Sequence, residues 1–142
     1  MLDKKFFTTL ANKMRKDYVD HIFEKGIDVN GSKFKSYSSK YGIRKRQNKF
    51  KRQSAAFANT TSPVLTGDLM NDAKPSSTTN SAKIRFAAHG GKINNLAKLG
   101  RVLTSDKQPL PTKVISMIDR EVEKEIKLKL PKSKRFKFKF GK

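Results

Sequence analysis

The chain has 142 residues and carries 33 lysines and arginines against 12 aspartates and glutamates, a formal net charge of +21 at pH 7. It contains no cysteine, which excludes disulfides and cysteine-ligated zinc sites. We expect no membrane span, because no apolar run approaches the roughly 18 residues that a span requires. We also expect no signal peptide, because acidic and periodic polar residues soon follow the N-terminus. The length predicts one domain, and the low apolar fraction, 35%, predicts a small core with exposed arms. The charge favours association with nucleic acid or with an acidic protein surface.

The first predicted element is a helix across residues 3–25. Its apolar side chains recur at intervals of three and four, which places them on one face. They are Phe6, Phe7, Leu10, Met14, Tyr18, Ile22 and Phe23. Gly26 follows, where the end of a helix favours a residue that can adopt positive φ.

A basic segment, residues 31–60, comes next and contains no acidic residue. Its cations are Lys33, Lys35, Lys40, Arg44, Lys45, Arg46, Lys49, Lys51 and Arg52. We expect a loop up to Gly42 and a weakly patterned helix over 43–57. Like-charged blocks usually form solvated faces or flexible arms. The alternative is a surface that contacts phosphates or an acidic partner. The interleaved aromatic residues, such as Tyr37 and Tyr41, either stack on bases or pin the loop to the core.

A short turn signal, residues 62–72, separates this basic segment from the second half of the chain. Thr66 can cap a short helical turn, and Gly67 permits a tight turn. Leu65 and Leu69 are predicted to anchor the segment in the core. Asp68 and Asp72 form a weak acid pair at helical spacing, and placement near the N-terminus of a short helix accounts for both.

The second half of the chain predicts one strand and two helices. A polar turn or loop over 74–80 precedes a strand over 82–87, in which small or apolar residues alternate with cations. A short helix over 93–99 is closed by Gly100. The last helix follows an extended, proline-containing entry, with Thr112 as N-cap, and runs to about Leu130, where Pro131 stops it.

A C-terminal arm, residues 131–142, follows that helix. Three phenylalanines alternate in it with basic residues, so an extended arm presents rings on one face and cations on the other. The residues concerned are Lys134, Arg135, Phe136, Lys137, Phe138, Lys139 and Phe140. We expect the arm to dock as an added strand, on its own sheet or on a neighbouring subunit. A disordered basic tail is the alternative.

The sequence offers no constellation for catalysis. His21 lies on the first helix, and His89 lies in a glycine-rich loop without a second metal ligand at useful spacing. His89-Gly90-Gly91 matches neither a Walker loop nor a dinucleotide fingerprint. We therefore expect no enzyme activity, no cofactor, no metal and no small-molecule substrate.

The order of these features resembles that of the tail-completion, or virion-morphogenesis, proteins of tailed bacteriophages. The matching pieces are the segment 31–38, Leu65-Thr66-Gly67-Asp68-Leu69, His89-Gly90-Gly91, and Leu110-Pro111-Thr112 before the last helix. The sequence departs from the family in having Phe86-Ala87-Ala88 at the end of the strand and no arginine in the proline-containing entry. The Phe/Lys arm has no counterpart in the family.

The resemblance implies an α+β fold, with a small antiparallel sheet against an N-terminal and a C-terminal helix, in one domain over residues 1–130. It also implies a homo-oligomeric ring in the virion neck, assembled in the host cytoplasm, that joins the DNA-filled head to the tail. Its partners would be portal or adaptor proteins, tail or tail-tube proteins, and genomic double-stranded DNA in the channel. A sequence-nonspecific nucleic-acid-binding protein of ribosomal or nucleoid type is the alternative, because the basic run and basic tail are typical of that class.

Overall fold

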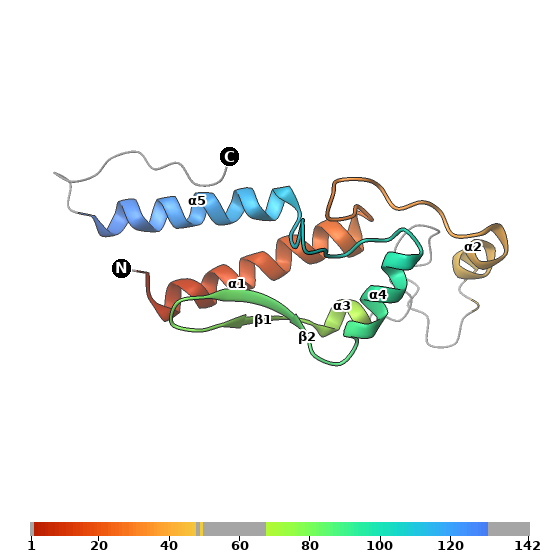
Figure 1. Ribbon diagram of the computed structural model, residues 1–142, viewed down its shortest axis with the longest axis horizontal. Coiled ribbons are helices and arrows are strands. Elements are labelled where there is room, and N and C mark those ends of the chain that lie inside the picture. Colours follow the sequence, from red (N-terminus) through yellow and green to blue (C-terminus); the bar gives the residue numbers. More distant parts are fainter. Residues whose placement is uncertain (1, 48, 50–67, 131–142) are drawn as a thin grey trace.

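The computed structural model of the chain describes residues 2–47, 49 and 68–130, and the expected α+β class is confirmed (Figure 1). The elements are α1 (Lys4–Val19), a π-helical turn η1 (Asp20–Glu24), α2 (Ser39–Arg46), α3 (Asp68–Asp72), β1 (Ala73–Ser77), β2 (Ala82–Phe86), α4 (Gly90–Lys98) and α5 (Thr112–Lys129). The C-terminal arm and the Leu65, Thr66 and Gly67 motif residues lie outside the described residues.

Helix α1 is the centre of the fold and confirms the predicted N-terminal helix. It begins after Asp3, whose carboxylate accepts a hydrogen bond from the backbone N–H of Phe6 at 2.8 Å. The predicted apolar stripe is the buried face, and η1 extends it through Ile22 and Phe23, which are fully buried. Gly26 then adopts a positive φ of 68°, as expected of a residue that ends a helix.

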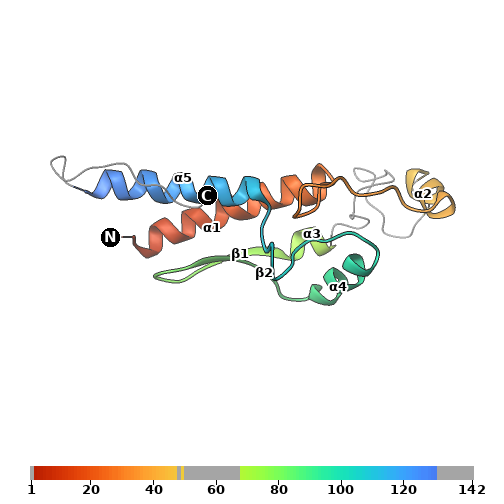
Figure 2. The same cartoon turned by 45° about the horizontal axis from the view of Figure 1, so that its top comes forward.

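Helix α5 runs antiparallel to α1 and lies along it (Figures 1 and 2). Val114 and Met117 bring its apolar stripe into the same core. Two ion pairs join the helices on their solvent side: Lys13 with Glu121 at 2.9 Å, and Lys129 with Asp3 at 3.5 Å. The predicted cap is wrong by one residue: Thr112 is the first helical residue, and Pro111 precedes it without a side-chain cap.

Strands β1 and β2 form an antiparallel hairpin that packs against α1. The hairpin turn lies near the N-terminal end of α1 (Figure 1), where the hydroxyls of Thr8 and Ser77 are 2.9 Å apart. The strand predicted at 82–87 is confirmed as β2, whereas the loop predicted at 74–80 is wrong over its first four residues. Pro75 argued against a strand there, but β1 is an edge strand, where a proline that donates no ladder hydrogen bond is tolerated.

One hydrophobic core unites α1, η1, α5, the hairpin and the loops between them. Its residues come from distant parts of the chain, including Leu69, Ala73 and Leu103. The short helix predicted at 93–99 is confirmed as α4, which Gly100 ends with a φ of 79°. It begins three residues earlier than predicted, so Gly90 and Gly91 belong to the helix and not to the expected glycine-rich loop.

The basic segment leaves this body as an arm. From Phe34 it extends to α2, which lies apart from α1 and α5 in both views (Figures 1 and 2). Helix α2 begins four residues earlier than the predicted helix over 43–57 and ends at Arg46, so the prediction is wrong at residues 47 and 49. Residues 48 and 50–57 fall outside the described residues.

Candidate nucleic-acid or acidic-partner interface

The base of the basic arm is held to the body by backbone bonds and one buried ring. The carboxylate of Asp28 accepts bonds from the backbone N–H groups of Asn30 and Ser32, each at 2.9 Å, which shapes the turn that starts the arm. Phe34 is buried in the core, and its N–H donates to the carbonyl of Gly26 at 2.8 Å. The arm therefore leaves the body from a fixed point.

Arg101 fastens the next part of the arm. Its guanidinium carbon lies 3.7 Å from the ring centroid of Tyr37, and its Nη2 donates to the carbonyl of Lys35. Tyr37 in turn packs on Tyr41 with ring centroids 4.7 Å apart. These tyrosines therefore pin the arm, which is one of the two roles left open by the sequence. The sequence analysis did not identify Arg101 as part of this site. The one sequence feature that marks Arg101 is its position directly after Gly100.

Among the predicted contact residues that the structure describes, Lys45 is the exception, because it is only 1% exposed. Its ammonium nitrogen lies 5.1 Å from the ring centroid of Tyr37. Burial, with a smaller contribution from the nearby Arg101 cation, lowers the pKa of Lys45 from 10.5 to about 8. The α2 helix turns this residue inward, so its assignment as a surface contact is corrected.

The remaining described cations of the arm face solvent. Lys33, Lys35, Lys40, Arg44, Arg46 and Lys49 are all exposed. They lie on the approach to α2, on α2 itself and just after it, so one projecting structure carries them. Lys51 and Arg52, the other two predicted contacts, lie outside the described residues.

Acidic residues are concentrated on the body. No aspartate or glutamate occurs between Asp28 and Asp68, whereas the ion pairs of α1 and α5 bring lysines against carboxylates. Lys25 and Lys113 both reach Asp20, at 3.1 and 3.6 Å. Positive charge is thus partly compensated along the helices and concentrated on the arm, where an anionic partner gains most.

The structural motif at residues 65–69 is described only from Asp68 onward. Leu69 is buried, as predicted. Asp68 is the first residue of α3, as expected, but Asp72 is the last, so helix N-terminal placement does not explain it. The carboxylate of Asp72 instead accepts bonds from the backbone N–H groups of Ala88 and His89, just before α4, at 2.8–3.1 Å. These bonds lower the pKa of Asp72, and the bond from His89 contributes most to the shift.

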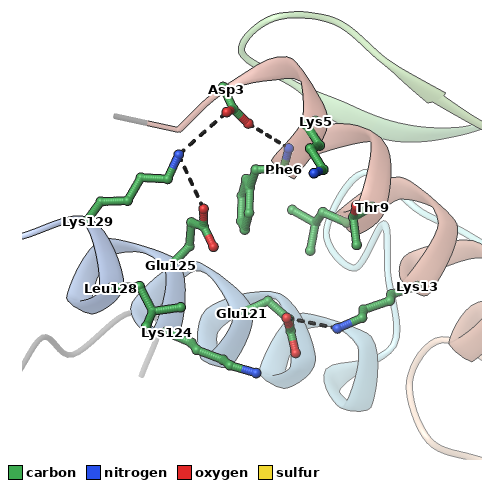
Figure 3. Close-up of a pocket in the computed structure, with 11 residues that line it drawn as sticks. Asp3, Lys5, Phe6, Thr9, Lys13, Glu121, Lys124, Glu125, Leu128 and Lys129 are labelled. Atoms are coloured by element: carbon green, nitrogen blue, oxygen red, sulfur yellow. Dashed lines mark hydrogen bonds and ion pairs between the residues drawn. The ribbon is translucent and has the colours of Figure 1, made fainter.

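A groove of about 450 Å³ lies between the N-terminal half of α1 and the C-terminal half of α5 (Figure 3). Phe6 and Leu128 line it, and ion pairs join charged residues across its rim. The Asp3 carboxylate there receives both the Phe6 N–H and the Lys129 ammonium, and these lower its pKa, the backbone bond more than the ion pair. Two further carboxylates of this groove are paired with lysines, Glu121 with Lys13 at 2.9 Å and Glu125 with Lys129 at 3.4 Å.

Over residues 2–47, 49 and 68–130, no group of three or more histidines, aspartates or glutamates is placed to hold a metal ion. No described helix combines the length and the apolar character needed to cross a membrane. His21 bonds through Nε2 to the carbonyl of Asp28 at 3.1 Å, in a structural role.

Comparison with family models, curated proteins and solved structures finds no match to the chain.

Proposed function

We propose that this protein is a structural subunit of a tailed-bacteriophage neck, a ring-forming connector or tail-completion protein between head and tail. The order of its motifs supports the proposal, as does an α+β body in which the hairpin and α5 both pack on α1. A ring multiplies each subunit's charge by its copy number, so an arm like this one would make a strongly positive collar.

The observation that carries the proposal is the projecting arm with exposed cations and no acidic residue. Contacts of lysine with phosphate are blind to sequence, and a genome that slides through a channel requires contact of that kind. An acidic face of a neighbouring neck protein is recognised by the same chemistry.

Two measurements test this function. The protein should be found at the head–tail junction of purified virions by labelled electron microscopy, and its mass in solution or on a template should be that of a defined oligomer. Its absence from virions would refute the proposal.

A matched pair of variants tests the arm. Replacing Lys33, Lys35, Lys40 and Lys49 by glutamine should weaken binding to duplex DNA and lower its salt dependence, by about 0.9 in log–log slope for each phosphate that the variant no longer neutralises. The control replaces four exposed lysines of the body, Lys5, Lys16, Lys92 and Lys98, and removes the same charge. Equally weakened binding in both variants would mean that net charge alone, and not the arm, binds DNA.

A sequence-nonspecific nucleic-acid-binding protein remains the second candidate, because the exposed cations of the arm need no ring to reach phosphates. It predicts tight, steeply salt-dependent binding by the isolated monomer. Failure of the monomer to bind duplex DNA or RNA at low salt would exclude it.

A further inference from the structure

The two edges of the hairpin are treated differently by the rest of the molecule. On the outer edge of β1, the carbonyl of Ala73 accepts a bond from Nε of Arg15 at 2.9 Å, and Pro75 has no N–H to offer. The side chain of Ser77 contacts Thr8 at the far end of the strand. The edge of β1 is therefore closed to a further strand.

The edge of β2 is open. The backbone N–H of Thr78 donates to the carbonyl of Ser81 at 2.9 Å, which makes that pair hydrogen-bonded and sets the alternation along the ladder. Arg85 and Lys83 then bond to β1, and the backbone groups of Ala82, Ile84 and Phe86 point away from it. The outward carbonyl of Ala73, paired with Phe86, agrees with this alternation. No backbone bond to these three residues is found within the described part of the chain.

An apolar groove of about 280 Å³ runs beside that edge. It is lined by Met14 and Tyr18 of α1 and by Ile84 and Phe86 of β2. Leu110, in the loop before α5, and Lys83, at the border of the groove, are among its other lining residues. A strand added to β2 would place every second side chain on this side of the sheet. Those side chains must be apolar.

The opposite face of β2 is cationic. Lys83 and Arg85 are both exposed, and they alternate with the residues that face α1. Lys74 lies directly across from Arg85, a like-charge pair that destabilises an isolated hairpin. Side chains of an added strand on this face would lie beside these cations, so carboxylates fit there.

We propose that the free edge of β2 binds an extended segment of a partner protein in which apolar and acidic side chains alternate. Backbone bonds to Ala82, Ile84 and Phe86 hold the strand, the groove takes its apolar side chains, and Lys83 and Arg85 pair with its carboxylates. This partner site is separate from the basic arm and does not depend on the neck function.

The chain's own C-terminal arm meets only half of these requirements. Its phenylalanines alternate as the groove demands, but the residues between them are Lys137 and Lys139. On β2 these would lie beside Lys83 and Arg85, where like charges repel. Charge complementarity therefore favours an acidic partner over the C-terminal arm of a second copy of the chain.

The test uses the full chain and a synthetic peptide of about six residues in which valine alternates with glutamate. A peptide of the same composition with the glutamates in one block is the control, since it keeps the charge and loses the alternation. Amide exchange followed by NMR should show new protection at Ala82, Ile84 and Phe86 with the alternating peptide alone. Binding of both peptides with no protection at these amides would overturn the proposal, because it would reflect the net charge of +21.

Two variants separate the edge from its charges. Ile84→Pro removes an outward N–H and leaves the β1–β2 ladder intact, so it should abolish the new protection. The double variant Lys83→Glu and Arg85→Glu keeps the edge and should bind the alternating peptide about tenfold more weakly, while favouring a valine–lysine peptide. An unchanged peptide preference in the double variant would also refute the proposal. A second result would also refute the proposal: protection of these amides in the absence of peptide that disappears when residues 131–142 are deleted. The C-terminal arm would then be what occupies the edge of β2.

Discussion

Replacing Tyr18 by phenylalanine should destabilise the fold through one orphaned carbonyl. The Tyr18 hydroxyl donates to the carbonyl of Leu103 at 2.6 Å, and both residues are almost fully buried. The bond ties α1 to the loop that leads to α5, across 85 positions of sequence. Phenylalanine keeps the ring and its edge-on contacts with Phe23 and Phe86, so the change isolates the hydroxyl.

The expected cost follows from what remains after the substitution. The carbonyl of Leu103 stays buried without this donor, which costs about 1–3 kcal/mol of stability. For a chain of this length, each kcal/mol lowers the melting temperature by about 2–4 °C. The same change at Tyr37 is the control, because its ring packs on Arg101 while no hydrogen bond from its hydroxyl is found in the described part of the chain. Tyr37→Phe should leave the melting temperature nearly unchanged.

Thermal unfolding followed by circular dichroism at several pH values adds an independent check. Burial raises the pKa of Tyr18 well above its ordinary value of 10.0. The unfolded chain therefore loses the phenol proton first, and the stability due to this group is complete below about pH 10 and falls as the pH rises further. Tyr18→Phe should flatten that alkaline decline, although Tyr37, whose pKa burial also raises, keeps part of it. Equal stability of Tyr18→Phe and Tyr37→Phe would refute the reasoning.

Three further predictions concern single residues. Leu69→Asp should prevent cooperative folding, seen as loss of the thermal transition, because it buries a charge in the core. Asp72→Ala should loosen the start of α4, measured as faster amide exchange at Ala88 and His89, and most clearly above the pH at which the carboxylate ionises. Lys45→Met should abolish a rise in melting temperature that the unsubstituted chain shows between about pH 8 and pH 10.5. The pKa of Lys45 is about 8 in the folded state and 10.5 in the unfolded chain. The destabilisation caused by burying the cation therefore disappears as the pH rises between these two values.

The elements with strong hydrophobic periodicity were predictable from the sequence. The apolar stripes of α1 and α5 and the alternation of β2 are local patterns, and each needs only an apolar surface to pack on. Gly26 and Gly100 end their helices as predicted, because positive φ is a property of the residue itself. Strand β1 was missed, since its stability comes from pairing with β2 and packing on α1, which its own residues do not encode.

The candidate interface also has features that the sequence predicts and features that depend on tertiary contacts. The sequence by itself determined that the arm is basic and free of acidic residues, because charge is set by composition. Only the tertiary structure decided which cations reach solvent: α2 turns Lys45 inward, and Arg101, more than 60 positions away from Lys35, holds the arm in place. It also decided which strand edge stays open, because Arg15 of α1 occupies the edge of β1 and leaves that of β2 free. Such contacts join residues distant in sequence, so no local pattern records them.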